Sequence, residues 1–66
     1  MIHIGFVHGQ FPYGGGEKIT SNIAPLLKEM GYAIYVFSSH IHHEQIDEED
    51  KKNITFVDVQ KTRLFS

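Results

Sequence analysis

The segment 9–16 carries four glycines and one proline, and it constrains the fold more than any other part of this 66-residue chain. Glycine loses more conformational freedom on folding than any other residue, and proline has no backbone amide to donate. Neither a helix nor a central strand suits this composition. The segment is therefore predicted to be a loop.

The segments on either side of this loop predict a strand and a helix. Residues 2–8 are apolar and rich in β-branched and aromatic side chains, as in a strand that is covered on both faces. Residues 17–30 predict an amphipathic helix, in which Gly31 can form the left-handed end and Pro25 introduces a kink. The apolar positions at helical spacing are Ile19, Ile23, Ala24, Leu26, Leu27 and Met30.

Two further apolar runs, residues 32–37 and 54–59, predict a second and a third strand. The helix between the first two strands makes a crossover connection, which favours parallel strands. The predicted fold class is α/β, a partial Rossmann-like three-layer unit with a three-stranded parallel sheet in the order 3-2-1.

The polar residues 40–53 predict a short surface helix or an ordered loop. The pairs Asp47/Lys51 and Glu48/Lys52 have the spacing of helical ion pairs. The acidic residues 44–50 are interpreted as a face in contact with solvent.

Composition excludes several classes of protein. The formal net charge is −2 and the six Lys and Arg residues are scattered, so no basic face for nucleic acid is expected. No apolar run approaches the ~20 residues of a membrane span. We expect a cytoplasmic location. Small folds usually add disulfides or a metal, and this chain has no cysteine and no regular metal-ligand spacing, so residues 1–66 are predicted to be a single truncated domain without a cofactor.

The glycine-rich loop itself suggests a binding site. Glycines between a strand and a helix let backbone amides approach an anion at the positive end of the helix, and phosphate is the natural ligand. The alternative is that the glycines only form a tight turn into the helix. Neither G-x-G-x-x-G nor G-x-x-x-x-G-K-[ST] is present.

Glu17 and the histidines each permit two interpretations. Glu17 either contacts a ligand hydroxyl or only complements the helix dipole. The histidines could bind a metal or serve in acid/base chemistry, but loop histidines without a ligand motif are more often structural, so no metal site is predicted. They are His3, His8, His40, His42 and His43.

The order of these motifs resembles the start of GT-B-fold nucleotide-sugar glycosyltransferases of the glycogen-synthase-like group. The matching segments are residues 14–17 (Gly-Gly-Gly-Glu), 23–27 (Ile-Ala-Pro-Leu-Leu) and 31–37, where Tyr32 stands at a position that is often histidine in the family. The resemblance implies an N-terminal, acceptor-side part of an enzyme that transfers a sugar, of hexosyl type, from a nucleotide sugar. The isolated chain is expected to be inactive.

The resemblance also implies a substrate site. The glycine-rich loop would approach the diphosphate of the nucleotide-sugar donor, with Gly14, Gly15, Gly16 and Glu17 as the substrate-binding residues. The other partners would be a glycan or lipid-linked acceptor and a C-terminal donor domain, with peripheral association at the inner face of the membrane as a further option. Because the donor domain is not part of the sequence, no catalytic residue is assigned.

A second hypothesis is a small, non-catalytic α/β binding or assembly module. An exposed sheet edge and an apolar helix face would then pair with another copy or with a partner, which makes a homo-oligomer possible.

Overall fold

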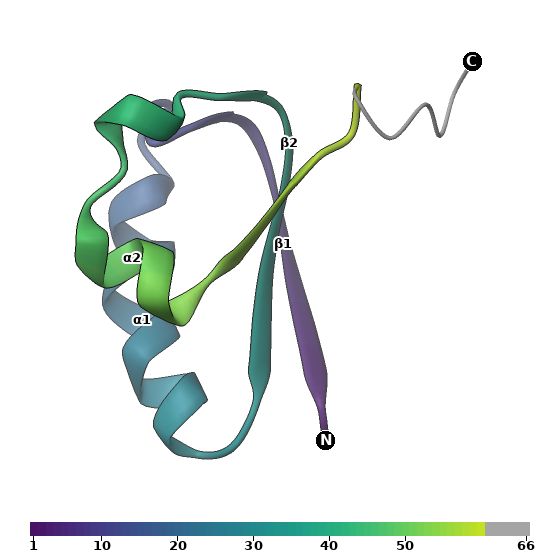
Figure 1. The fold of residues 1–66 in the computed structure, drawn as a ribbon, viewed down its shortest axis with the longest axis vertical. Coiled ribbons are helices and arrows are strands. Elements are labelled where there is room, and N and C mark those ends of the chain that lie inside the picture. The colour runs from purple at the N-terminus through teal and green to yellow at the C-terminus, as the bar shows by residue number, and fades with distance from the viewer. Residues whose placement is uncertain (61–66) are drawn as a thin grey trace.

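The computed structural model describes residues 1–60, so the last six residues of the predicted domain lie outside the described part. Two helices and a 3-10 helix lie on one side of a three-stranded sheet (Figure 1). The elements in chain order are β1 (His3–Phe11), α1 (Glu17–Glu29), β2 (Ala33–Ile41), the 3-10 helix η1 (His43–Gln45), α2 (Glu48–Asn53) and β3 (Thr55–Asp58).

The sheet is parallel, with β2 between β1 and β3. Phe6, Val36 and Phe56 lie side by side in one row of the register. Successive side chains of a strand point to opposite faces, and in β2 the buried residues Ile34, Val36 and Ser38 alternate with partly exposed ones. The predicted α/β class with a parallel three-stranded sheet is confirmed.

The core lies between the sheet and the two helices. Its buried apolar residues are Phe11, Ala24, Ile34, Val36, Ile46 and Ile54. The rings of Phe11 and Phe56 lie with their centroids 5.1 Å apart, so the end of β1 contacts β3 across the central strand. Ile46 and Ile54 lie just before and just after α2, which fixes both ends of this short helix against the core.

Within residues 1–60 the helices cover only one face of the sheet, so this part of the chain has two layers where three were expected (Figure 1). On the open face Val7 is 85% exposed. A Cβ atom at Gly5 would lie 2.8 Å from the Phe37 ring, so glycine at this position leaves room for the ring beside β1. The prediction that the first strand is covered on both faces is therefore wrong for the described residues.

The first two strands are longer than predicted. Gly9, Gln10 and Phe11 belong to β1, so the predicted loop over 9–16 is wrong for its first three residues. Gln10 pairs with His40 and Phe11 pairs with Ile41, and Phe11 is fully buried. Burial of this aromatic side chain outweighs the cost of a glycine in an outer strand.

The helix α1 ends as predicted. Gly31 has a φ of +94°, and its amide donates to the Lys28 carbonyl at 2.9 Å. The apolar positions of α1 divide into two sets. Ala24 and Leu27 pack on the core, whereas Ile19, Leu26 and Met30 are more than half exposed.

The acidic stretch is not entirely a solvated face. Asp50 is only 7% exposed and accepts a hydrogen bond from the Ser21 hydroxyl at 2.8 Å. The ion pair in α2 joins Lys51 to Glu48 at 3.4 Å, and neither predicted pair is formed. Asp50 therefore lies inside the fold, whereas the ion pair of Lys51 and Glu48 is on the exposed side of α2.

No helix within residues 1–60 is long and apolar enough to cross a membrane.

Candidate functional site

The glycine-rich loop lies at the carboxyl edge of the sheet, where parallel strands of open α/β sheets place their ligands. It follows the end of β1 at Phe11 and leads directly into α1 at Glu17. Gly14 and Gly15 have φ values of +106° and +83°, a conformation that residues with a Cβ rarely adopt. These two glycines are therefore required by the turn itself.

The first amides of α1 have no side-chain cap. Gly16 occupies the N-cap position and has no side chain that could accept a hydrogen bond from them. The first amides of a helix also have no partner within the helix. A helix of 13 residues thus presents free donors, at its positive end, toward the carboxyl edge of the sheet.

His8 joins β1 to α1 beneath this loop. Its Nε2 lies 2.8 Å from Oγ1 of the buried Thr20, and its ring meets the edge of Phe11 at 5.2 Å between centroids. A Cβ atom at Gly16 would lie 3.4 Å from the His8 ring. His8 therefore acts as a positioning residue that holds the start of α1 close to the strand, and Gly16 permits the close approach.

Glu17 is partly buried in the first turn of α1. Its Oε2 atom is inaccessible to solvent and has no hydrogen-bond partner among the described residues. A buried acceptor without a donor costs about 1–3 kcal/mol, and native structures hold few such atoms. Glu17 also lines a pocket at this edge of the sheet, so rotation of its side chain would bring this acceptor to a ligand.

A pocket of about 470 Å³ adjoins Glu17. It is bounded by the start of the loop after β1, the first two turns of α1 and the segment from η1 to α2, and the glycines 14–16 do not line it. The lining residues are Pro12, Tyr13, Glu17, Lys18, Ser21, Asn22, Gln45, Asp47 and Asp50. Three carboxylates and one ammonium group make its wall rich in acceptors, which suits hydroxyl groups better than a free anion.

The structure brings the sequence-predicted residues Gly14, Gly15, Gly16 and Glu17 together in one turn at the start of α1. Lys18 lines the same pocket. Sequence reasoning missed the roles of Tyr13, Ser21 and Asp50, because they lie in segments that only the fold brings side by side. The one available signal was the proximity of Tyr13 to the glycines along the chain.

The histidines at the end of β2 and just after it lie at the same edge but do not converge. His42 Nε2 is 3.3 Å from Gln10 Oε1, and the Tyr13 ring meets its edge at 5.0 Å between centroids. His40 contacts the neighbouring Ser39 hydroxyl. Within the described part of the chain no three His, Asp or Glu side chains are grouped so that they could hold a metal ion.

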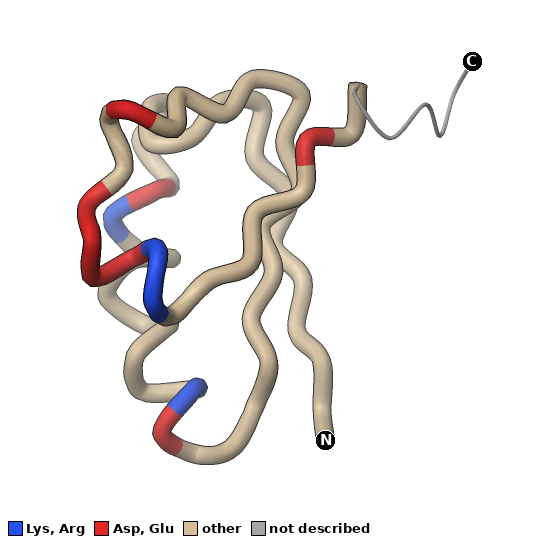
Figure 2. Tube along the Cα trace, viewed as in Figure 1, with Lys and Arg blue, Asp and Glu red and all other residues tan. Residues whose placement is uncertain are grey.

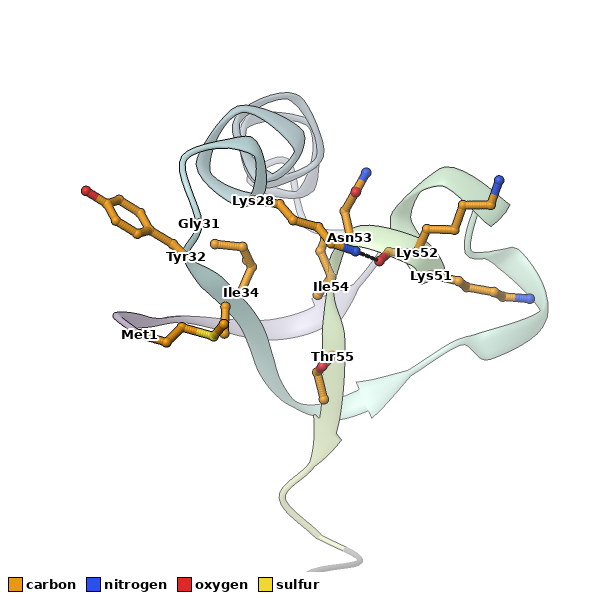
Figure 3. A pocket seen from close by; sticks show the side chains of 11 residues that line it. Met1, Lys28, Gly31, Tyr32, Ile34, Lys51, Lys52, Asn53, Ile54 and Thr55 are labelled. Atoms are coloured by element: carbon orange, nitrogen blue, oxygen red, sulfur yellow. Dashed lines mark hydrogen bonds between the residues drawn. The ribbon is translucent and has the colours of Figure 1, made fainter.

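A second pocket, of about 330 Å³, lies at the amino edge of the sheet (Figure 3). Lys28 from the last turn of α1 donates to the Lys52 carbonyl at its rim, while the side chains of Lys51 and Lys52 extend away from Met1 and Ile34. The ammonium group of Lys28 is thus already bonded to a carbonyl at the C-terminal end of α2. The carboxyl edge remains the better candidate site.

Searches of protein-family models, curated proteins and solved structures find no match to this chain.

Proposed function

We propose that the chain is the N-terminal, acceptor-side part of a GT-B-type glycosyltransferase and that the start of α1 contributes one wall of its nucleotide-sugar site. The sheet in the order 3-2-1 would be the first portion of a Rossmann-like domain. The observation that carries the proposal is the juxtaposition of uncapped helix amides with the unpaired Oε2 of Glu17.

A nucleotide sugar supplies a partner for each of these groups. Its diphosphate is an anion that the amides of residues 15–17 and the positive end of α1 attract. Its sugar and ribose hydroxyls are donors that the Glu17 carboxylate accepts. A simple anion would satisfy the amides and leave Glu17 unpaired.

In this proposal the chain's residues bind and orient substrate. Gly14 and Gly15 shape the turn, Gly16 lets the start of α1 lie close to His8, and Glu17 orients a hydroxyl. Stabilisation of a leaving diphosphate also requires donors from the facing domain, so the chain by itself is expected to bind and not to turn over.

A nuclear magnetic resonance titration with UDP tests the proposal. In the isotope-labelled, folded chain, the amides of residues 14–18 should shift selectively and saturably. Inorganic phosphate at the same concentration controls for simple anion binding. The Gly15→Ala variant should lose the shifts, whereas Gly9→Ala, where a Cβ has open space, should retain them. Shifts spread evenly over the chain, or no shifts at all, would contradict the proposed site.

A further inference from the structure

The flank of α1 that faces away from α2 carries an apolar surface without a cover among the described residues. Its members are spaced along one side of the helix and are 69%, 38%, 60% and 64% exposed. We define the α1 stripe as Ile19, Ile23, Leu26 and Met30. On the opposite flank Ser21 bonds to Asp50 and Lys28 bonds to Lys52, so α2 already occupies that side.

The α1 stripe lies on the same side of the molecule as the β1 edge of the sheet. β1 pairs only with β2, so its second edge is open within residues 1–60. The Ala33 amide donates to the Ile2 carbonyl at 2.8 Å, and backbone groups of successive residues point to alternate sides. The backbone groups of Gly5 and Val7 therefore face the open edge.

We propose that the 66-residue chain by itself binds a second copy through this combined surface, around a two-fold axis perpendicular to the sheet. Such an axis pairs the two β1 edges in antiparallel fashion and keeps both α1 helices on the same face, with their stripes in contact. Val7 is the midpoint of β1 and Ile23 is the midpoint of α1, so one axis can pass near both. The interface is self-complementary, as two-fold symmetry requires.

Charge on α1 favours a second copy as the occupant. Its charged residues lie at its two ends, and the residues between them are uncharged (Figure 2). Lys18 and Glu29 border the α1 stripe on its solvent side. Antiparallel helices around the proposed axis bring Lys18 of each protomer beside Glu29 of its partner, which forms two equivalent ion pairs.

The area also favours joint use of strand and helix. When the apolar area of each side chain is taken from its transfer free energy, the exposed parts of the α1 stripe amount to roughly 200 Å² per protomer. A stable interface covers roughly 800 Å² per partner. The stripe alone is too small, and the edge of β1, with nine residues, supplies the additional contact.

Sedimentation equilibrium of the 66-residue chain over a range of concentrations tests the proposal. The wild type should form a dimer as concentration rises. The Leu26→Glu variant should weaken dimerisation at least about tenfold, because a charge would be placed against the partner's apolar stripe. Lys52→Glu changes a charge on α2, away from the interface, and should leave the dimer unchanged. Circular dichroism verifies that each variant is folded.

Charge reversal identifies the occupant. Lys18→Glu and Glu29→Lys should each weaken the homodimer about fivefold to thirtyfold, because two attractive pairs become repulsive. The double variant should restore the wild-type affinity, and an equimolar mixture of the two single variants should form heterodimers preferentially. A folded chain that stays monomeric would overturn the proposal. A dimer whose affinity changes with neither Leu26→Glu nor the charge reversals would overturn it as well. The α1 stripe would then be left for a different protein.

Discussion

The two flanks of α1 differ in a way that departs from the usual amphipathic pattern. The side that packs on the sheet and α2 presents Leu27 together with smaller or polar side chains, among them Ser21 and Ala24. The side that faces solvent presents larger apolar ones, such as Leu26 and Met30. The inner flank is held by close approach and hydrogen bonds, which leaves the larger apolar residues for contacts outside the described fold.

In our proposals, one helix has two tasks. Its N-terminus, with the glycine-rich loop and Glu17, binds a small ligand, whereas its apolar flank binds a second copy of the chain. The following substitutions test whether the inner flank stabilises the fold and the outer flank does not.

Phe11→Ala should have the largest effect. Phe11 is fully buried in the core cluster that also contains Ala24, and removal of a buried aromatic ring costs about 3–5 kcal/mol. A domain of this size has little stability to lose, so we expect the variant to be largely unfolded at room temperature. Urea denaturation followed by circular dichroism measures the effect, and a native-like transition would contradict this description of the core.

Ser21→Ala should destabilise the chain by about 1.5–3 kcal/mol. The substitution removes the donor to the Asp50 carboxylate, which is then left buried with one partner fewer. Thermal unfolding measures the loss. Asn22→Ala, at the next position of the same helix and exposed, is the matched control and should change stability little. Equal effects of the two variants would show that the polar contact between α1 and α2 does not stabilise the fold.

Ala24→Leu should cost about 1–3 kcal/mol, because Ala24 has no exposed surface and a larger side chain must displace its neighbours. Urea denaturation provides the measurement. A stabilised variant would indicate that α1 has space beneath it, in which case small residues are not needed for its close approach to the sheet.

Leu26→Gln should have the smallest effect on the monomer, below about 0.5 kcal/mol, because the side chain is 60% exposed. The measurement is urea denaturation at a concentration low enough to keep the chain monomeric. A loss comparable to that of Ser21→Ala would show that the outer flank already has a cover within the chain, and the contrast between the two flanks would fail.

Sequence patterns predicted which helices and strands occur in this fold better than they predicted where each one begins and ends. The glycines and the apolar runs were sufficient to predict three strands, the long helix and their parallel arrangement. The extension of β1 to Phe11 was not predictable from local composition, because it depends on pairing with Ile41 and on burial of the ring. The burial of Asp50 likewise depends on a contact with Ser21, 29 residues away.

The candidate site was predicted only where it is continuous in sequence. Gly14 to Glu17 form one turn, so their proximity follows from the chain itself. Another part of the pocket wall comes from a separate segment, with Gln45, Asp47 and Asp50, and its position depends on the fold. Helical periodicity could not indicate which apolar flank of α1 the sheet would cover.

The central claim is that Glu17 accepts a hydroxyl of a ligand whose diphosphate lies at the start of α1. Calorimetric titration of UDP and of a UDP-sugar into the wild type and into Glu17→Gln tests it most directly. We predict that the wild type prefers the UDP-sugar and that Glu17→Gln loses much of this preference while still binding UDP. An unchanged preference in Glu17→Gln, or a wild type that binds neither ligand, would contradict the claim.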